Sequence, residues 1–554
     1  MKSLKTPLSG MALHPAASAY AQEVGAGTMS RREFLTRATA LGVTAPAAYG
    51  LIGLTAPVHA QEAQPVAGGT LRMNMEMRAL KDPRTWDWNE MANVCGGWLE
   101  YLVEYQRDGS LRPMLLESWE ANADATQWTL RVRPGVKWNN GDDFTAEDVA
   151  HNIRRWCDGN LEGNSMSARF DTLRDVEGTN QAREDAIVVV DPLTVQLNLS
   201  APDIATVVNM ADYPAVMVHQ SYDGGDLIAN PIGTGPYLPE VFSVGDRAVL
   251  VRNTNHVWWG TEVLGGPYLD RIEYIDYGLD PATVVAAAGS GELDATWHTT
   301  GDFINVYEDL GWQTSDVITA GTMVVRFHQA TAPYDNREVR KALQRAVDNN
   351  ILLEVGYNGL GQVAENHHVC PVHPEYAPNV NEAPDPAGAK AALEAAGHGD
   401  TEFELISVDV EWQSTTCDAV AAQLRDAGIN VKRTVMPGST FWNDWTKYPF
   451  SATEWNMRPL GVQIYNLAYK TGVAWNESGF ANAEFDALLA EANAISDVDA
   501  RREVMAKLQR IMLDEGVVIQ PYWRSLFRST RPGVHNLEPH PTHLHQHYRW
   551  WIEA

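Results

Sequence analysis

The sequence predicts an α/β fold with two large lobes, a hinge between them and a third, inserted subdomain. Its 554 residues are 45% apolar and 20% charged, a globular composition on a chain longer than one hydrophobic core usually organises. Between residues 323 and 523, segments with helical periodicity alternate with short apolar segments, as in an α/β lobe. Residues 230–237 read NPIGTGPY, and two prolines with two glycines predict a rigid crossing between lobes.

The first half of the chain is predicted to be rich in strands. Residues 68–77 alternate between apolar and polar side chains, which is typical of a strand. Thr145 is expected to cap a helix that has Asp148 at its third position. A hairpin is expected to turn at Asp191 and Pro192. The remaining predicted elements of this half are strands at 128–133, 247–253 and 270–275 and a helix at 281–288.

The second half is predicted to alternate helices with strands, beginning with a strand at 323–328. Asp335 is expected to cap a helix, because the apolar residues after it recur at helical spacing. Pro386 is expected to open another helix, which Gly397 ends. The remaining predicted elements are helices at 414–427, 482–492 and 504–512 and strands at 429–435 and 517–523.

An export signal is predicted at the N-terminus. Residues 30–36, SRREFLT, form a twin-arginine pattern, and an apolar stretch at 38–58 follows. Small residues at Val58 and Ala60 predict cleavage before Gln61. Met29 lies just before the pattern, so residues 1–28 are expected to be an over-extended start. The sequence therefore predicts a periplasmic protein.

The four cysteines, Cys95, Cys157, Cys370 and Cys417, would meet an oxidising compartment after export, where disulfides are allowed. Four cysteines permit three full pairings, and the sequence does not choose among them. None of the cysteines lies at CxxC spacing, which argues against a thioredoxin-like or zinc-ribbon role.

Several stretches resemble the family 5 solute-binding proteins of ABC importers, whose members bind di- and oligopeptides, nickel complexes, glutathione and some oligosaccharides. They are NPIGTGPY at 230–237, WTLRVR at 128–133, TAEDV at 145–149 and YDNREVRKALQRAVD at 334–348. The resemblance runs from about residue 68 to the C-terminus. It implies a periplasmic-binding-protein-like fold, no catalytic residue and no cofactor, and delivery of a solute to an ABC permease and ATPase complex in the inner membrane.

The predicted organisation combines this resemblance with the order of the elements. The expected parts are a signal peptide at 1–60, a linker at 61–67, the first part of lobe I at 68–110, an inserted subdomain at 111–229, the second part of lobe I at 230–321, lobe II at 322–525 and a C-terminal return to lobe I at 526–554.

Residues 453–478 are the stretch most informative about the ligand. In peptide-binding members of the family this region carries an Asp that pairs with the peptide's α-amino group. Here the corresponding loop holds Trp455, Asn456 and Arg458, and no Asp lies in the stretch. Arg458 can grip a carboxylate or phosphate of the solute, or it can satisfy backbone carbonyls under the loop, and both alternatives stay open.

Aromatic side chains are the second indication of the ligand. Trp412, Trp455 and Trp475 are predicted to provide flat walls for an organic solute, with Trp412 and Trp455 in loops that follow strand-like segments. Thr296, Trp297 and His298 lie at the end of a predicted strand whose carboxyl end is expected to face the ligand crevice, so they are candidates for its rim.

Histidines raise a metal-binding alternative. His367, His368 and His373 lie in one proline-punctuated connection. A second histidine run at 540–547 is expected to alternate along a C-terminal strand, which would point its rings to opposite faces. Clustering without a coordination geometry is weak support for a metal site.

The predicted function is capture of a small organic solute, peptide-like or acidic, by a monomeric periplasmic receptor. The alternatives are a nickel or metal-chelate binder or an oligosaccharide binder of the same fold, a true dipeptide or oligopeptide binder that uses an acid outside residues 453–478, and an exported hydrolase. No GxSxG, P-loop or HExxH motif supports an enzyme. The formal net charge of −29 argues against binding nucleic acid or an anionic membrane surface, which bind clustered cations.

Overall fold

The computed structural model describes residues 64–553 except positions 87, 279, 300, 302, 379–382 and 474, together with positions 21, 22, 24, 34, 51 and 52. The chain divides into two compact units, Met1–Pro65 and Val66–Ala554, and the following account concerns the second. The predicted signal peptide and its cleavage site at Gln61 lie outside the described residues, apart from those six positions. In the described part of the chain, no helix combines the length and the apolar character needed to cross a membrane.

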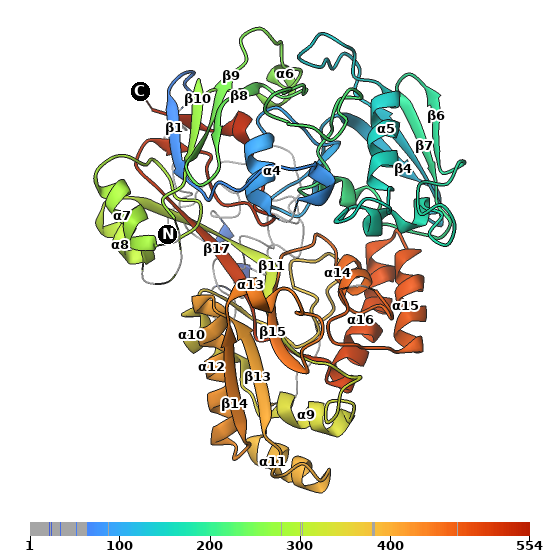
Figure 1. Cartoon of the computed structure of the whole chain (residues 1–554), viewed down its shortest axis with the longest axis vertical. Helices are drawn as coiled ribbons and strands as arrows, with labels where there is room; N and C mark the ends of the chain where they lie inside the picture. The colour runs from blue at the N-terminus through green and yellow to red at the C-terminus, as the bar shows by residue number, and fades with distance from the viewer. Residues whose placement is uncertain are drawn as a thin grey trace, which may run out of the picture. The chain divides into compact units, whose positions relative to one another are not determined.

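A four-stranded sheet in the order β1-β10-β9-β8 forms one part of the second unit (Figure 1). β1 pairs with β10 in parallel, and the other neighbours are antiparallel. The elements of this part are β1 (Thr70–Asn74), η1 (Pro83–Thr85), α4 (Asn89–Cys95), β2 (Val103–Tyr105), β3 (Leu111–Pro113), β8 (Tyr237–Ser243), β9 (Arg247–Arg252), α6 (Thr261–Leu264), β10 (Arg271–Ile275), α7 (Pro281–Gly289) and α8 (Phe303–Asp309).

A second four-stranded sheet, in the antiparallel order β4-β5-β7-β6, follows β3 in the chain. The predicted capping box is confirmed, because the side chains of Thr145 and Asp148 satisfy each other's backbone N–H groups at the start of α5. The predicted hairpin at Asp191 is confirmed by β6 and β7. The elements are β4 (Leu116–Ala121), β5 (Gln127–Val132), α5 (Ala146–Trp156), η2 (Ser167–Leu173), β6 (Ile187–Asp191), β7 (Thr194–Asn198) and η3 (Val208–Ala211).

The run at 230–237 leads from this sheet into β8 and packs closely on the segment before β2. The backbone N–H of Gly235 donates to the carbonyl of Trp98 at 2.9 Å. A Cβ at Gly233 would lie 1.9 Å from the same carbonyl oxygen, so the close approach requires glycine there.

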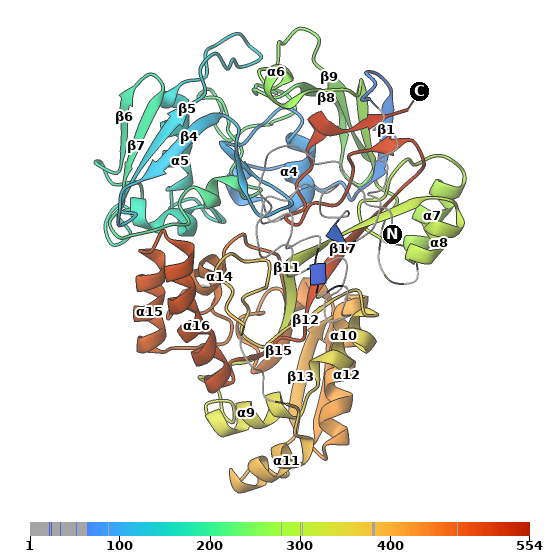
Figure 2. The same ribbon diagram turned by 180° about the vertical axis from the view of Figure 1, so that it is seen from behind.

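A seven-stranded sheet, in the order β12-β17-β11-β15-β13-β14 with β16 paired to β11, forms the other part. In Figures 1 and 2, α10 and α12 lie on one side of it, and α14, α15 and α16 lie on the other. The strands are β11 (Gln313–Phe327), β12 (Gly361–Val363), β13 (Phe403–Val408), β14 (Val431–Met436), β15 (Phe450–Trp455), β16 (Val518–Ile519) and β17 (Tyr522–Thr530).

The helices of this part begin with α9 and end with α16. The cap of α9 is Asn336, one residue after the predicted Asp335. Pro386 opens α11 as predicted, and the helix ends two residues before Gly397. The helices are α9 (Arg337–Arg345), α10 (Asn349–Tyr357), α11 (Pro386–Ala395), α12 (Glu411–Asp426), α13 (Gly438–Phe441), α14 (Gly461–Ala468), α15 (Ala483–Asn493) and α16 (Val498–Glu515).

Two long antiparallel strands, β11 and β17, join the two parts (Figure 1). Their register runs from Gln313 opposite Thr530 to Thr322 opposite Trp523, with a shift between Ile318 and Thr322. At the far end, Ala295 bridges both Met73 of β1 and Thr530 of β17. The boundary that the sequence predicts between lobe I and lobe II, at residues 321 and 322, therefore falls inside β11, beside the shift in register.

Three predictions of local structure are wrong. Trp412 lies in the first turn of α12, and Trp455 is the last residue of β15, so neither is in a loop. The strand predicted through the histidine run at 540–547 is absent: β18 (Val534–His535) is followed by turns, η4 (His547–Arg549) and β19 (Trp551–Ile552). His543 has a φ of 63°, a left-handed conformation that is incompatible with a continuous strand.

All four cysteines are buried free thiols. They lie in separate surroundings, Cys95 at the end of α4, Cys157 after α5, Cys370 in a loop and Cys417 inside α12. Burial raises the pKa of Cys157 and of Cys417 to about 12. The three possible pairings left open by the sequence are therefore all absent.

Candidate functional site

Two arginines on β17 stack on two of the predicted tryptophans. The Cζ atom of Arg524 lies 4.1 Å from the ring centroid of Trp412, and that of Arg528 lies 5.6 Å from the ring centroid of Trp297. Residues four apart in a strand point to the same face. β17 therefore brings Trp412 and Trp297, which are more than a hundred positions apart in sequence, to the same face of one strand.

The Arg524 end of this line is half-open and charged. Arg524 forms an ion pair with Glu454, and its Nε donates to the hydroxyl of Tyr357 at 3.2 Å. Burial acts to lower the pKa of Arg524, but interactions with Tyr357 and Glu454 outweigh it and raise that pKa. Trp412 and Glu454 remain partly exposed, so a solute could contact this group of side chains.

The Arg528 end is buried. Arg528 is 2% exposed and donates to the carbonyls of Trp297 and Leu537 at 3.3 and 3.1 Å. No carboxylate among the described residues forms an ion pair with Arg528, and burial lowers its pKa to about 10 against the opposing influence of Tyr274 and Glu538. Thr296 is fully buried and its Oγ1 accepts from the N–H of Ser529 at 2.9 Å. Thr296 is therefore positioned as an anchor of β17.

Histidines and aromatic rings surround Trp297. Its ring centroid lies 4.4 Å from that of His298 and 4.8 Å from that of His545. His543 Nδ1 is 3.1 Å from His298 Nε2, and His545 and His547 both contact the hydroxyl of Tyr274 at 2.7 Å. Burial lowers the pKa of His543 and of His547 to about 3, so both rings are neutral at pH 7.

Trp455, the last residue of β15, and Trp475, in a turn between α14 and α15, form a second aromatic group. Their ring centroids are 6.0 Å apart. Trp455 is 5% exposed, and its Nε1 donates to Glu477 at 2.7 Å; Glu477 also pairs with the buried Arg326 at 3.0 Å. Asn456 follows directly and is exposed. Trp455 is thus mostly packed within the protein, while Asn456 is open to solvent.

Arg458 lies beneath the loop that carries Asn456. It is 8% exposed, and its Nη1 donates to the carbonyls of Asn456 and Met457 at 3.3 and 3.1 Å. Burial lowers the pKa of Arg458, and the charge of Asp212 opposes that shift. Its Nε has no hydrogen-bond partner among the described residues. These contacts are the ones expected if Arg458 satisfies backbone carbonyls under the loop, the second of the two alternatives for this residue.

The three histidines of the metal alternative bind separate partners. His367 Nε2 contacts Glu365 at 2.7 Å, and His368 Nδ1 contacts the hydroxyl of Tyr469 at 2.7 Å. His373 accepts from the N–H of Cys370 and donates to the carbonyl of Arg458. Within the described part of the chain, no group of three or more His, Cys, Asp or Glu side chains is placed to hold a metal ion.

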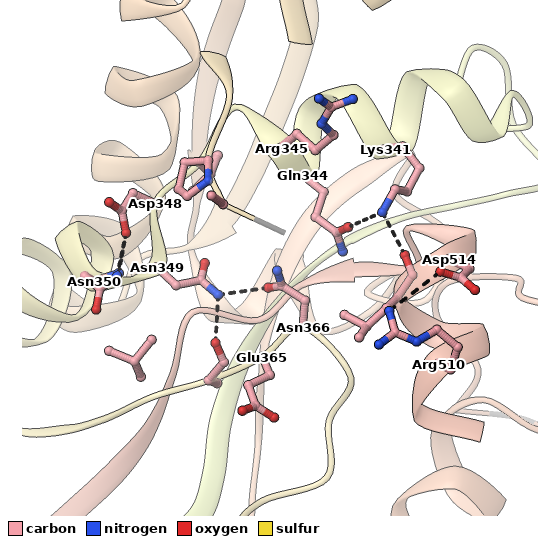
Figure 3. A pocket seen from close by; sticks show the side chains of 16 residues that line it. Lys341, Gln344, Arg345, Asp348, Asn349, Asn350, Glu365, Asn366, Arg510 and Asp514 are labelled. Atoms are coloured by element: carbon pink, nitrogen blue, oxygen red, sulfur yellow. Dashed lines mark hydrogen bonds and ion pairs between the residues drawn. The ribbon is translucent and has the colours of Figure 1, made fainter. Parts of the chain in front are cut away.

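Two cavities have no β17 residue in their lining. One, of about 390 Å³, is bounded by residues between 341 and 514, and Figure 3 shows Asn349 hydrogen-bonded to Asn366 among the lining side chains, which include Lys341 and Arg510. The other, of about 280 Å³, lies between the aromatic side chains of Tyr105, Trp119 and Trp128 and a wall that includes Pro374, Pro459 and Arg501. Neither cavity includes a predicted site residue.

Sequence reasoning missed Arg524, Arg528 and Glu454 as members of this region. Arg524 and Arg528 lie at i and i+4 after an apolar run that was predicted to be a strand, and this spacing was the available signal. Trp412 and Trp297, on which the two arginines stack, are distant in sequence. Only the folded strand brings each arginine to its tryptophan.

Comparisons with known proteins agree with this architecture. The family model for bacterial extracellular solute-binding proteins, family 5, matches residues 110–476. The periplasmic oligopeptide-binding protein OppA of Haemophilus influenzae is 24% identical over 471 residues, covering 79% of this chain and 85% of the relative. The nickel-binding periplasmic protein of Escherichia coli is 29% identical over 306 residues, covering 54% and 55%. The binding protein AgaA of A. tumefaciens, solved with agropinic acid, superposes with a TM-score of 0.73 at 22% identity, covering 88% of this chain and 99% of that one.

Proposed function

Because the chain belongs to the family 5 bacterial extracellular solute-binding proteins, we propose that it captures a small organic solute, peptide-like or acidic, between two lobes. It then delivers the solute to an ABC permease and ATPase complex of the inner membrane. The proposal includes export by the twin-arginine route, a periplasmic location, a monomeric state and no catalytic role. The peptide-like class is supported by the oligopeptide-binding relative, the acidic class by the structure solved with agropinic acid, and the metal alternative by the nickel-binding relative.

The observation that carries the proposal is the strand pair β11 and β17. β17 carries Arg524, whose side chain is 12% exposed, against the partly buried ring of Trp412 in α12. The proposed lobes follow the sequence boundaries, with lobe I at 68–110 and 230–321, an insertion at 111–229, lobe II at 322–525 and a C-terminal return at 526–554. Lobes joined by a few strands close on ligands by bending at those strands.

The proposed solute site contains the predicted residues in graded positions. Asn456 is exposed and would contact the solute directly. Trp412, Trp297 and Trp475 are half-buried and would form its walls. The deeply buried residues Thr296, Trp455 and Arg458 would support that surface, and the Nε of Arg458 is a buried donor without a partner among the described residues.

The test is to identify the bound solute. The protein is purified under native conditions from cells that produce it, dialysed, denatured with acid, and the released small molecules are identified by mass spectrometry. We expect one dominant organic compound in near-stoichiometric amount. Adding that compound to stripped protein should raise the melting temperature and reduce the radius of gyration in X-ray scattering, because the ligand binds only the native, closed state.

Two outcomes would reject this proposal. If no compound is released and none from a panel of peptides, opines and organic acids changes the melting temperature, the protein is not a solute receptor of this class. If the compound is chemically converted while the protein closes on it, the exported hydrolase is the better assignment. Metal analysis of the dialysed sample tests the nickel alternative separately.

A further inference from the structure

The proposed inserted subdomain, residues 111–229, contacts the helices of the proposed lobe II. Its four-stranded sheet and the seven-stranded sheet are separate. In both Figure 1 and Figure 2 the subdomain lies beside α15 and α16. Residues 203–209, which run from the loop after β7 into η3, make this contact. We call this segment the clasp.

Hydrogen bonds within the subdomain fix the shape of the clasp. The indole Nε1 of Trp128 donates to the carbonyl of Asp203 at 3.1 Å, and the N–H of Asp203 donates to the carbonyl of Ala125 at the same distance. The carboxylate of Asp203 accepts from the N–H of Ala205 at 2.8 Å, as in an Asx turn. The bonds that shape the clasp therefore come from its own subdomain.

Two hydrogen bonds join the clasp to lobe II. Nε2 of Gln463 in α14 donates to Oδ1 of Asn209 at 2.6 Å, and both side chains are buried. The N–H of Ile204 donates to the carbonyl of Asn493, the last residue of α15, at 3.2 Å. The clasp thus makes one side-chain bond and one main-chain bond to lobe II.

The amide groups of Asn209 and Gln463 are satisfied from both sides of the contact. Nδ2 of Asn209 donates to the carbonyl of Arg169 within the subdomain at 3.0 Å. Oε1 of Gln463 accepts from the N–H of Leu460 within lobe II at 2.9 Å. Each side chain therefore has one bond in its own part and one across the contact. Because a buried amide without a partner is unfavourable, this pair favours the arrangement in which the two parts touch.

Apolar packing accompanies these bonds. Ala125, Ile204 and Ala205 belong to the same buried cluster as residues of α14, α15 and α16. Beside this contact, the cavity of about 280 Å³ lies between the rings of Trp119 and Trp128 and lobe II. Protein cores are packed with few voids larger than a water molecule. The clasp and lobe II therefore meet as two surfaces, as domains that move against each other do, and not as one continuous core.

From this contact we propose that the clasp holds the closed form of the receptor, through the bond between Asn209 and Gln463 and the apolar side chain of Ile204. The inference rests on the proposed function and assigns the inserted subdomain a role in it. The clasp shares no residue with the proposed solute site, so it acts without the solute. It keeps a share of the receptor closed beforehand, which reduces the free energy that solute binding must supply for closure.

Two variants and two matched controls test the clasp in stripped protein, with no ligand added. Gln463→Glu keeps the acceptor at the start of α14 but, when ionised, has no donor for Asn209. Ile204→Ser removes apolar contact from the clasp. The controls make similar changes at exposed positions, Gln362→Glu in β12 and Val188→Ser in β6. Melting curves show which variants are folded.

Hydrogen–deuterium exchange of peptides that cover residues 203–209 and X-ray scattering, both at pH 8, are the measurements. We expect each variant to lose about tenfold of the wild-type protection in these peptides, because its closed form lacks a bond or an apolar contact that the open form never has. The radius of gyration should increase as well. The controls should match the wild type, and peptides of α5, in the same subdomain, should keep their protection in every variant.

The proposal is overturned if a folded Gln463→Glu or Ile204→Ser keeps the wild-type protection and radius of gyration, or if the controls change as much. It is also overturned if α5 loses protection equally, because the subdomain then unfolds and does not open. If one variant does not fold, the other decides alone. The proposed function is judged separately by the released solute, and it fails if no solute is released or bound, whatever the clasp does.

Discussion

Arg524 and Arg528 share one face of β17, and each stacks on a tryptophan, yet their surroundings are opposite. Arg524 has a carboxylate partner in Glu454, and its pKa is raised. Arg528 has carbonyls and a neutral histidine around it, and burial lowers its pKa to about 10. Four residues along one strand therefore separate an arginine that pairs with a partly exposed carboxylate from an arginine that donates to buried backbone carbonyls.

The difference shows that residue type and strand position do not determine role. A guanidinium can act on a solute only where its neighbours leave part of the group accessible and its charge is balanced. At the Arg528 end, the rings of His298 and His545 pack against Trp297. At the Arg524 end, Trp412 and Glu454 remain partly open.

Lowering the pH should destabilise the histidine-rich Arg528 end more than the Arg524 end, and this is the largest effect that we expect. The pKa of His540 and of His547 is about 3 in the native protein, against roughly 6.5 in an unfolded chain. Both rings are neutral in the native protein. Their contribution to the free energy of unfolding is therefore complete above about pH 6.5 and is lost as the pH falls toward 3. At pH 5 the loss is about 4 kcal/mol for the two rings together. Urea midpoints followed by tryptophan fluorescence at pH 7, 6 and 5 measure this loss.

The variant His547→Gln sharpens the acid prediction. It removes one of the two rings, so the decrease in unfolding free energy between pH 7 and pH 5 should be about 2 kcal/mol smaller than in the wild type. A urea midpoint that does not change between pH 7 and pH 5 in the wild type would contradict the neutral, buried state of these histidines.

Replacing Arg528 by Met should cost more stability than replacing Arg524 by Met. Arg528→Met leaves the buried carbonyls of Trp297 and Leu537 without a donor, which should lower the unfolding free energy by about 3 kcal/mol. In Arg524→Met, the partly exposed Glu454 can turn to water. Urea midpoints of the two variants measured side by side make the comparison, and equal losses would remove the distinction between the two ends.

Trp412→Ala should weaken binding of the native solute about tenfold, which is about 1.4 kcal/mol, with little change in melting temperature. The reason is that Trp412 is only partly buried and offers its ring at the half-open end. Trp412→Phe, which keeps an aromatic face, is the matched control. Calorimetry with the identified solute measures the effect, and an unchanged affinity in Trp412→Ala would place the solute elsewhere.

Local signals in the sequence predicted much of the fold. The capping box of Thr145 and Asp148 and the proline start of α11 depend on residues within one turn, so they can be read without tertiary structure. The start of α12 carried no such signal, because its N-cap, Val410, makes no side-chain capping bond. Trp412 was therefore expected in a loop and is instead helical.

The site depends on contacts that no local pattern contains. Arg458 stood out because it departs from the family pattern, whereas Arg524 became notable only when β17 carried it to Trp412. The C-terminal histidines alternate in sequence as a strand would, but the left-handed residues Asn536 and His543 turn the chain and gather the rings around Trp297. Backbone conformation of this kind overrides alternation.

The four isolated thiols mean that no covalent cross-link contributes to the stability of this protein. Its folding requires no oxidase or disulfide isomerase, and the native state is equally accessible in the reducing cytoplasm and in an oxidising envelope. This property agrees with the proposed twin-arginine export, in which a chain folds before it crosses the membrane. Its melting temperature should therefore be the same with and without dithiothreitol.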